Sequence, residues 1–180
     1  HEEIISLLPI LSRRHILDSK HLEQLQISAC TGFLGNSSKT NDLEKIRESW
    51  KTIPKKIRNH PPILAGYVKV LFGVRQYAQA EKILRKRIEQ EWDANLVALY
   101  GEIITDKPER ILKKLEAWAV DHEDDPGVGI ARARQCMQAG LWGQARTMIN
   151  DLLKNNASPT LYNLLADVDE RLGDKKRSLS

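Results

Sequence analysis

The stretch Gly140-Leu141-Trp142-Gly143-Gln144-Ala145 decides the fold class, because it has the features of the end of one helix followed by the start of another. Glycine at its first position permits the left-handed backbone that commonly ends a helix. Alanine at its last position is small enough for two helices to cross closely, between the large side chains of Trp142 and Ile149. The stretch therefore predicts an antiparallel pair of helices joined by a short turn.

The same pattern recurs along the chain at a nearly constant interval. Counted from Ala145, the matching positions are Ala80 and Ile111 before it and Ser178 after it. A helix pair repeated at a period of about 34 residues is the signature of a solenoid, in which each pair buries its apolar face against its neighbours. We therefore expect an all-α fold of stacked antiparallel helix-turn-helix repeats.

Proline marks the expected starts of these repeats. It is favoured at the first position of a helix, where its missing N–H would have had no partner, and a short polar residue before it can cap the helix. The signals are His60-Pro61, Asp106-Lys107-Pro108-Glu109, Asp125-Pro126 and Ser158-Pro159. They predict repeats at about 61-93, 94-124, 126-157 and 159-180 (the last truncated), so that 59-180 forms one continuous solenoid with the helices before it.

Residues 1-58 are expected to form N-terminal helices that are repeat-like but degenerate. Apolar residues at helical spacing predict helices over 4-11 and 19-34, with a loop at 35-38. Asn41 is expected to cap a third helix, with Glu44 completing a capping box. No strand is expected, because even 103-105 fits a helical pattern.

The composition narrows the class of protein but not its function. The 180 residues carry a net charge of +4, are 41% apolar, and include only 10 Gly and 7 Pro, too few turn residues for an all-β sandwich. No apolar run approaches the ~20 residues of a membrane span. The start at His1 is interpreted as that of a fragment of a longer protein. Cys30 and Cys136 both lie on apolar stripes, which predicts buried reduced thiols.

The repeat resembles the tetratricopeptide repeat, a helix-turn-helix family with a period of about 34 residues that stacks into a right-handed solenoid. The resemblance is clearest in the opening stretch, in Leu165-Ala166 and in Arg171-Leu172-Gly173-Asp174, whereas Ile111 and Arg87 depart from it. It implies that packing positions of the repeat are held by Tyr77, Ala80, Gly140, Trp142, Ala145, Ala166 and Gly173, with Gly173 as a second helix-ending turn.

The whole arrangement is similar to the C-terminal half of the HemY family, proteobacterial tetratricopeptide proteins linked to haem biosynthesis. The features are a Leu-Leu-Pro opening at 7-9, a central Trp50 helix followed by basic residues, and the helix Leu161-Tyr162-Asn163-Leu164-Leu165-Ala166-Asp167. The resemblance implies a protein anchored in the bacterial inner membrane by two upstream helices, with its repeats on the cytoplasmic side. It supplies no catalytic residues.

Motifs for catalysis, metal binding and covalent haem attachment are missing from the sequence. The five histidines are scattered, and neither cysteine belongs to a Cys-x-x-Cys pair. The acidic run Glu123-Asp124-Asp125 is interpreted as a loop that caps the following helix, where carboxylates complement the helix dipole. Trp50, Trp118 and Trp142 are expected in the core, and Trp92 is expected to be partly exposed. The sequence therefore predicts neither an enzyme nor a cofactor.

Two surfaces remain as candidate sites. Helix pairs that stack in a curve line a groove with their first helices. The resemblance to the tetratricopeptide repeat implies that the groove-facing positions are Lys69, Phe72, Arg134, Gln138, Asn163, Asp167 and Glu170. A possible anionic-surface patch, which could contact lipid headgroups, consists of Lys51, Lys55, Lys56 and Arg58. A second basic stretch consists of Arg75, Lys82, Arg85, Lys86 and Arg87. Nucleic acid is not expected as a partner, because Glu81, Glu89 and Glu91 interleave with this stretch.

These features predict a non-catalytic scaffold region that binds a protein or peptide, with haem-pathway enzymes as candidate partners through the family resemblance. Two alternatives stay open: a carrier of porphyrin or haem, and a peptide-binding helical repeat unrelated to haem.

Overall fold

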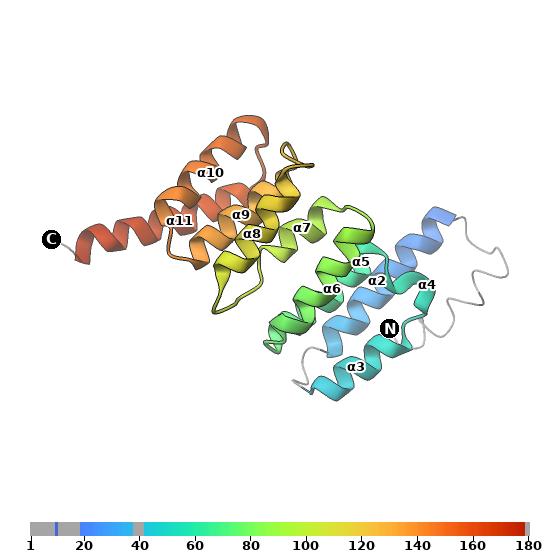
Figure 1. Ribbon diagram of the computed structural model, residues 1–180. Helices are drawn as coiled ribbons and strands as arrows, with labels where there is room; N and C mark the ends of the chain where they lie inside the picture. The colour runs from blue at the N-terminus through green and yellow to red at the C-terminus, as the bar shows by residue number, and fades with distance from the viewer. Residues whose placement is uncertain (1–9, 11–18, 38–41, 179–180) are drawn as a thin grey trace. The chain divides into compact units, whose positions relative to one another are not determined.

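The computed structural model describes residues 10, 19–37 and 42–178, and its helices are labelled in Figure 1. Within these residues every regular element is helical, which confirms the predicted all-α class. The helices are α2 (Ser19–Ser37), α3 (Leu43–Thr52), α4 (Lys55–Arg58), α5 (Pro61–Gly73), α6 (Tyr77–Gln90), α7 (Ala94–Tyr100), α8 (Pro108–Ala119), α9 (Pro126–Gln138), α10 (Trp142–Asn155) and α11 (Pro159–Ser178). The helix predicted over 4-11 lies outside the described residues apart from Ile10.

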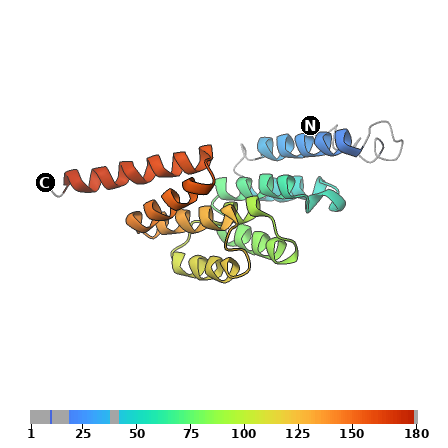
Figure 2. The ribbon, with the colours of Figure 1, turned by 90° about the horizontal axis from the view of Figure 1, so that it is seen from above.

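The chain divides into two compact units, 1–83 and 84–180, with the boundary inside α6. This division does not test the repeat boundaries given above, which remain a prediction. In the first unit α2 packs against α3 and α5, and Figure 2 shows α2 alongside α5. Its core includes Cys30, Leu34, Ile46 and Leu71, all of them fully buried.

The second unit is organised around α9, which packs against α7, α8 and α10, while α11 packs mainly against α10. One buried cluster joins α9, α10 and α11: Ala133, Cys136, Ala145, Ile149, Leu161, Leu164 and Val168. Ala145 is fully buried there, as the helix-crossing role predicted for it requires. Ala80 is also fully buried.

The turns that end α5 and α9 have the same hydrogen bonds. After α5, the N–H of Arg75 donates to the Phe72 carbonyl and that of Gln76 to the Leu71 carbonyl. After α9, Gly140 donates to Met137 and Leu141 to Cys136, so both turns are Schellman motifs. The left-handed residue is Gly140 at φ 73° in one turn and Arg75 at φ 58° in the other. The structure thus confirms the turn predicted at Gly140.

Replacing Arg75 with glycine is expected to stabilise the protein by about 0.5 to 1 kcal/mol. An L-residue in the left-handed region is strained by roughly 1–2 kcal/mol, and the greater freedom of glycine in the unfolded chain offsets part of the gain. Gly140→Ala, which places a side chain in the same conformation, should destabilise by about 1 kcal/mol. Urea denaturation of the two variants would contradict this interpretation of the turns if both shifts had the same sign.

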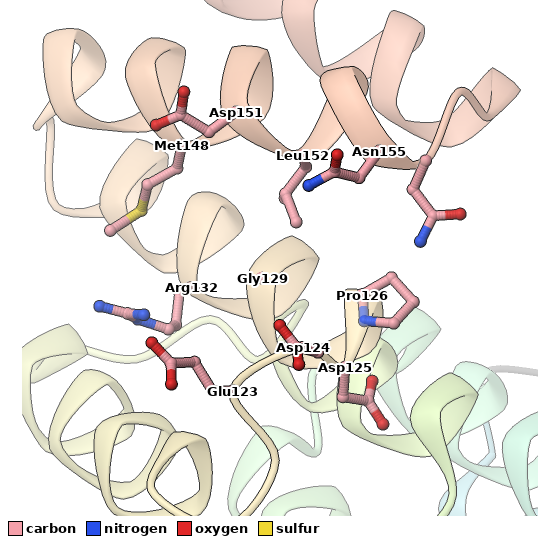
Figure 3. Close-up of a pocket in the computed structure, with 11 residues that line it drawn as sticks. Glu123, Asp124, Asp125, Pro126, Gly129, Arg132, Met148, Asp151, Leu152 and Asn155 are labelled. Atoms are coloured by element: carbon pink, nitrogen blue, oxygen red, sulfur yellow. The ribbon is translucent and has the colours of Figure 1, made fainter.

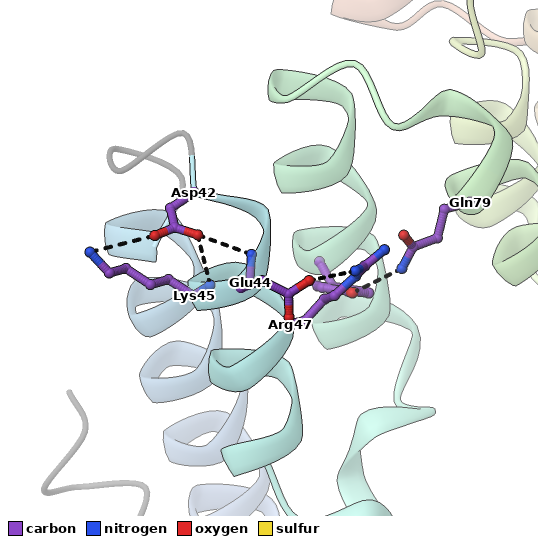
Figure 4. A network of polar contacts seen from close by, with 6 residues as sticks. Asp42, Glu44, Lys45, Arg47 and Gln79 are labelled. Carbon is purple, nitrogen blue, oxygen red and sulfur yellow. Dashed lines mark hydrogen bonds and ion pairs between the residues drawn. The ribbon is translucent and has the colours of Figure 1, made fainter.

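Three predicted helix ends differ from the structure. The cap of α3 is Asp42, not Asn41, and its carboxylate accepts from the N–H groups of Glu44 and Lys45 (Figure 4). Lys107 is the cap residue of α8, and the side chain that bonds there is Thr105, which accepts from the Lys107 N–H. At the end of α2 the helix continues through Ser37, so residues 35–37 of the predicted loop are helical.

The repeat positions of α11 were also predicted wrongly. Gly173 is not a turn, because α11 runs through it to Ser178. A single glycine costs only about 1 kcal/mol in a helix, and the strong helix formers around it offset that cost. Ala166 is exposed, because α11 buries the opposite face, which carries Leu161, Leu164 and Val168.

Of the three tryptophans predicted in the core, Trp118 is buried, whereas Trp50 and Trp142 are half-buried. A guanidinium lies near the ring of each half-buried tryptophan, from Arg58 at Trp50 and from Arg171 at Trp142. The indole ring is so large that tryptophan is rarely buried completely, even where most of its surface is packed.

Both cysteine thiols are free and buried, as predicted. Burial raises the pKa of Cys30 from 9 to about 11, and it also raises the pKa of Cys136. The folded chain therefore holds these protons more tightly than the unfolded chain does.

The free energy of unfolding should therefore be unaffected by Cys30 below pH 9. Between pH 9 and 11 the titration of this thiol should lower it, by up to about 1.4 kcal/mol per pH unit. Urea denaturation at pH 7, 9 and 10.5 measures this loss, and the Cys30→Ala variant, which lacks the thiol, should lose less. An equal pH dependence in the two proteins would contradict the assignment to Cys30.

Candidate binding groove

Two glycines bring α7 directly against α9. A side chain at Gly101 would lie 2.8 Å from Ala131 Cβ, and one at Gly127 would collide with the backbone of Ala94. Only hydrogen fits between the two backbones at these points. The loop that follows α7 is therefore held close to one side of α9.

Gln135 fixes the path of that loop. Its side chain is completely buried, and Nε2 donates to the carbonyl oxygens of Gly101 and Ile103, at 2.9 Å each. The segment 103–105 is an irregular connection between α7 and α8, so its predicted helical conformation is wrong. Ile104 is left 58% exposed at its outer edge.

A cavity of about 490 Å³ opens between this loop and the helices α9, α10 and α11. Its volume lies within the range of about 300–1,000 Å³ typical of ligand sites. It is lined by Gly101, Glu102, Ile104 and Thr105 of the loop, Arg134, Met137 and Gln138 of α9, Trp142 of α10 and Leu164 of α11. We call it the α9 groove.

Two of the predicted groove residues, Arg134 and Gln138, lie in the α9 groove. The Arg134 guanidinium donates to the Ala98 carbonyl at 2.8 Å and pairs with Glu102 at 2.9 Å. Gln138 is exposed, and its amide can both donate and accept hydrogen bonds. The groove thus carries a neutralised ion pair, an accessible amide and a largely apolar lining.

The remaining predicted groove residues lie elsewhere. Asn163, Asp167 and Glu170 are exposed on α11, but the α11 residue that lines the groove is Leu164. Lys69 is exposed on α5, and Phe72 is half-buried with its ring 5.4 Å from that of Tyr77. Both belong to the first unit, so they are no part of this cavity.

Sequence reasoning missed the loop residues of the groove and the role of Gln135. The loop was assigned a helical pattern, although Gly101 is a signal for the end of a helix. No sequence pattern distinguishes Gln135, because its two acceptors are backbone carbonyls 34 and 32 residues away along the chain.

A smaller cavity of about 290 Å³ lies on the other side of α9 (Figure 3). The acidic run lines it together with Met148, Asp151 and Leu152 of α10. Asp125 is the cap of α9, as predicted, since its Oδ1 accepts from the Gly127 N–H at 2.7 Å. Its Oδ2 accepts from the indole N–H of Trp92 at 2.6 Å. Among the described residues no cluster of His, Cys, Asp or Glu could hold a metal ion.

Trp92 is half-buried, in agreement with its predicted partial exposure. Its ring stacks on His122 with centroids 3.5 Å apart and meets Trp118 edge-on at 6.0 Å. The bond to Asp125 completes a network that joins the start of α7, the end of α8 and the start of α9. This network is structural support for the unit that contains the groove.

In the predicted anionic-surface patch, Arg58 differs from the three lysines. Lys51, Lys55 and Lys56 are exposed. The Arg58 guanidinium donates to the carbonyls of Lys51 and Ile53 at the end of α3 and lies 5.9 Å from the centre of the Trp50 ring. Trp50 in turn stacks on Tyr67 at 4.1 Å. Arg58 therefore ties α4, with Lys55 and Lys56, to the end of α3, which carries Lys51.

Comparison with curated proteins finds bacterial relatives at low sequence identity. Proteins from Escherichia coli K12, Escherichia coli O157:H7 and Shigella flexneri are each 22% identical to this chain over 169 residues. The match covers 94% of this chain and 42% of each relative. The chain is similar to Protein HemY. This finding confirms the resemblance seen in the sequence.

The chain thus spans about two fifths of the length of the HemY proteins it matches. No family model matches it, and no solved structure matches it significantly. Within the described part of the chain, no helix is both long and apolar enough to cross a membrane.

Proposed function

We propose that this chain is a non-catalytic protein-binding region of a protein associated with haem biosynthesis, and that the α9 groove holds a segment of the partner. The association with haem rests on the similarity to HemY over 94% of the chain. From the family resemblance we also propose that the parent protein is anchored in the inner membrane and that this region lies on its cytoplasmic side.

The observation that carries the binding role is the α9 groove itself. Its backbone framework is fixed by the close contact of α7 with α9 and by the two hydrogen bonds of Gln135. Preorganised walls reduce the entropy lost on binding. Its lining also offers the mixture of apolar surface and few polar groups that suits recognition of a polypeptide.

A photo-cross-linking amino acid at position 138 tests the proposal in the native cells. The expected result is cross-linking to one polypeptide, identified by mass spectrometry as an enzyme of haem biosynthesis. A cross-linker at Gln144, which is exposed on α10 and does not line the groove, is the matched control. Equal capture at both positions, or no capture at 138, would overturn the proposal.

Titration of the unsubstituted chain with haem should give no saturable change in the Soret band. A saturable change that Arg134→Ala abolishes would make porphyrin the occupant of the groove and would also overturn the proposal.

A further inference from the structure

The charge of Arg134 is already balanced before any partner arrives. Its guanidinium is held between Glu102 and the Ala98 carbonyl, and its side chain is only 20% exposed. An acidic group placed in the groove would compete with Glu102 and lose its hydration. A basic group would be repelled by the Arg134 guanidinium. Neither sign of charge is therefore favoured inside.

Beyond the groove, the face of α11 that carries Leu164 has charges of both signs. Asp167 follows Leu164 by one helical turn and is exposed. Arg171 lies a further turn along, with its guanidinium 6.0 Å from the centre of the Trp142 ring. These two charges lie on the same helix face and are opposite in sign, so this face of α11 adds no net preference for either sign of charge.

The apolar contribution to the groove comes from four side chains on four elements: Ile104 of the loop, Met137 of α9, Trp142 of α10 and Leu164 of α11. Ile104 stands out because 58% of its surface is exposed to solvent. Covering such a side chain with an apolar group is favourable, because it removes apolar surface from water. Gln138, on the same side of α9, can both donate a hydrogen bond to a peptide backbone and accept one from it.

From these observations we infer that the α9 groove selects a partner segment by one large uncharged apolar side chain, inserted between Ile104 and Trp142, while Gln138 bonds to the segment's backbone. This inference rests on the proposed function and adds the chemistry of the partner to it. Leucine and phenylalanine fit this class, and lysine and glutamate do not.

The test uses residues 1–180 and four acetylated, amidated decapeptides, each with a Gly/Ser host and a central guest of Leu, Phe, Lys or Glu. Binding is followed by ¹H–¹⁵N correlation spectra, at the Trp142 indole N–H and the Gln138 side-chain amide. The Leu and Phe peptides should shift both signals saturably, with affinities at least tenfold higher than those of the Lys and Glu peptides.

Two variants at equally exposed residues test whether the peptides bind in the α9 groove. Ile104 is 58% exposed and lines the groove, whereas Tyr162 is 57% exposed and does not. Ile104→Ser should weaken the Leu peptide at least fivefold, and Tyr162→Ser should leave its affinity unchanged. Both residues are on the surface, so neither variant should impair folding.

Equal affinity for charged and apolar guests would overturn the inference, although the groove would remain a protein-binding site. Failure of all four peptides to shift the two signals, or equal effects of the two variants, would also overturn it. The proposed function is judged separately by cross-linking from position 138, so the two failures are distinguishable.

Discussion

Gly127→Ala is expected to destabilise the protein by about 3 kcal/mol, the largest effect of any single methyl group considered. A Cβ at this position would collide with the Ala94 carbonyl oxygen and lie 2.8 Å from its carbonyl carbon. Neither atom can move without displacing the start of α7. Overpacking of this kind usually costs roughly 1–3 kcal/mol, and backbone obstacles place it at the upper end of that range.

Gly143→Ala is the matched control. Gly143 lies in α10, and a Cβ there would have nothing within 4 Å. Alanine is favoured over glycine in a helix by roughly 0.5–1 kcal/mol, so this variant should be slightly more stable than the parent. Urea denaturation followed by far-UV circular dichroism compares the two. A loss below about 1 kcal/mol for Gly127→Ala would show that α7 can move away from α9 at little cost.

The second large effect is expected for Gln135→Leu, at about 2–4 kcal/mol. Leucine has nearly the same side-chain volume as glutamine, but it cannot donate hydrogen bonds to the buried carbonyls of Gly101 and Ile103. Leaving a buried carbonyl without a partner costs roughly 1–3 kcal/mol. Part of that loss is offset, because the buried Oε1 of Gln135, which has no hydrogen-bond partner among the described residues, disappears as well.

Gln144→Leu is the control for this change, because Gln144 is exposed on α10 and should alter stability by less than about 0.5 kcal/mol. The Gln135→Leu variant also carries a local signature. Hydrogen exchange of the amides at 103–105 should accelerate more than exchange within α10. A uniform acceleration would mean that Gln135 supports the unit generally and not this loop.

The helices that the sequence predicted well are those with strong terminal signals. Pro61, Pro108, Pro126 and Pro159 each begin a helix, because a residue without an N–H loses nothing at that position. Gly140 ends α9 in the left-handed conformation. One error occurs where two neighbouring residues could each act as the N-cap, as at Asn41 and Asp42. Another occurs where a helix continues through an isolated glycine, as at Gly173.

The candidate site was predictable only in part. Arg134 and Gln138 were identified because the resemblance to the tetratricopeptide repeat supplied the groove-facing positions of the first helix in each pair. The loop residues that complete the groove depend on a contact between α7 and α9, and on a glutamine that bonds to carbonyls 34 and 32 residues away. Such contacts have no signature in local sequence. The three other polar residues expected from α11 are exposed, and the residue of α11 that lines the groove is apolar.

The pairing of near neighbours along the chain has a kinetic consequence. In the second unit most of the packing joins helices that are neighbours in sequence, such as α9 with α10 and α8 with α9. Few long loops must close before these contacts form, so the loop-closure entropy in the transition state is small. Helical proteins with such local contacts fold in microseconds to milliseconds. Each helix pair can therefore form before distant parts of the chain have met.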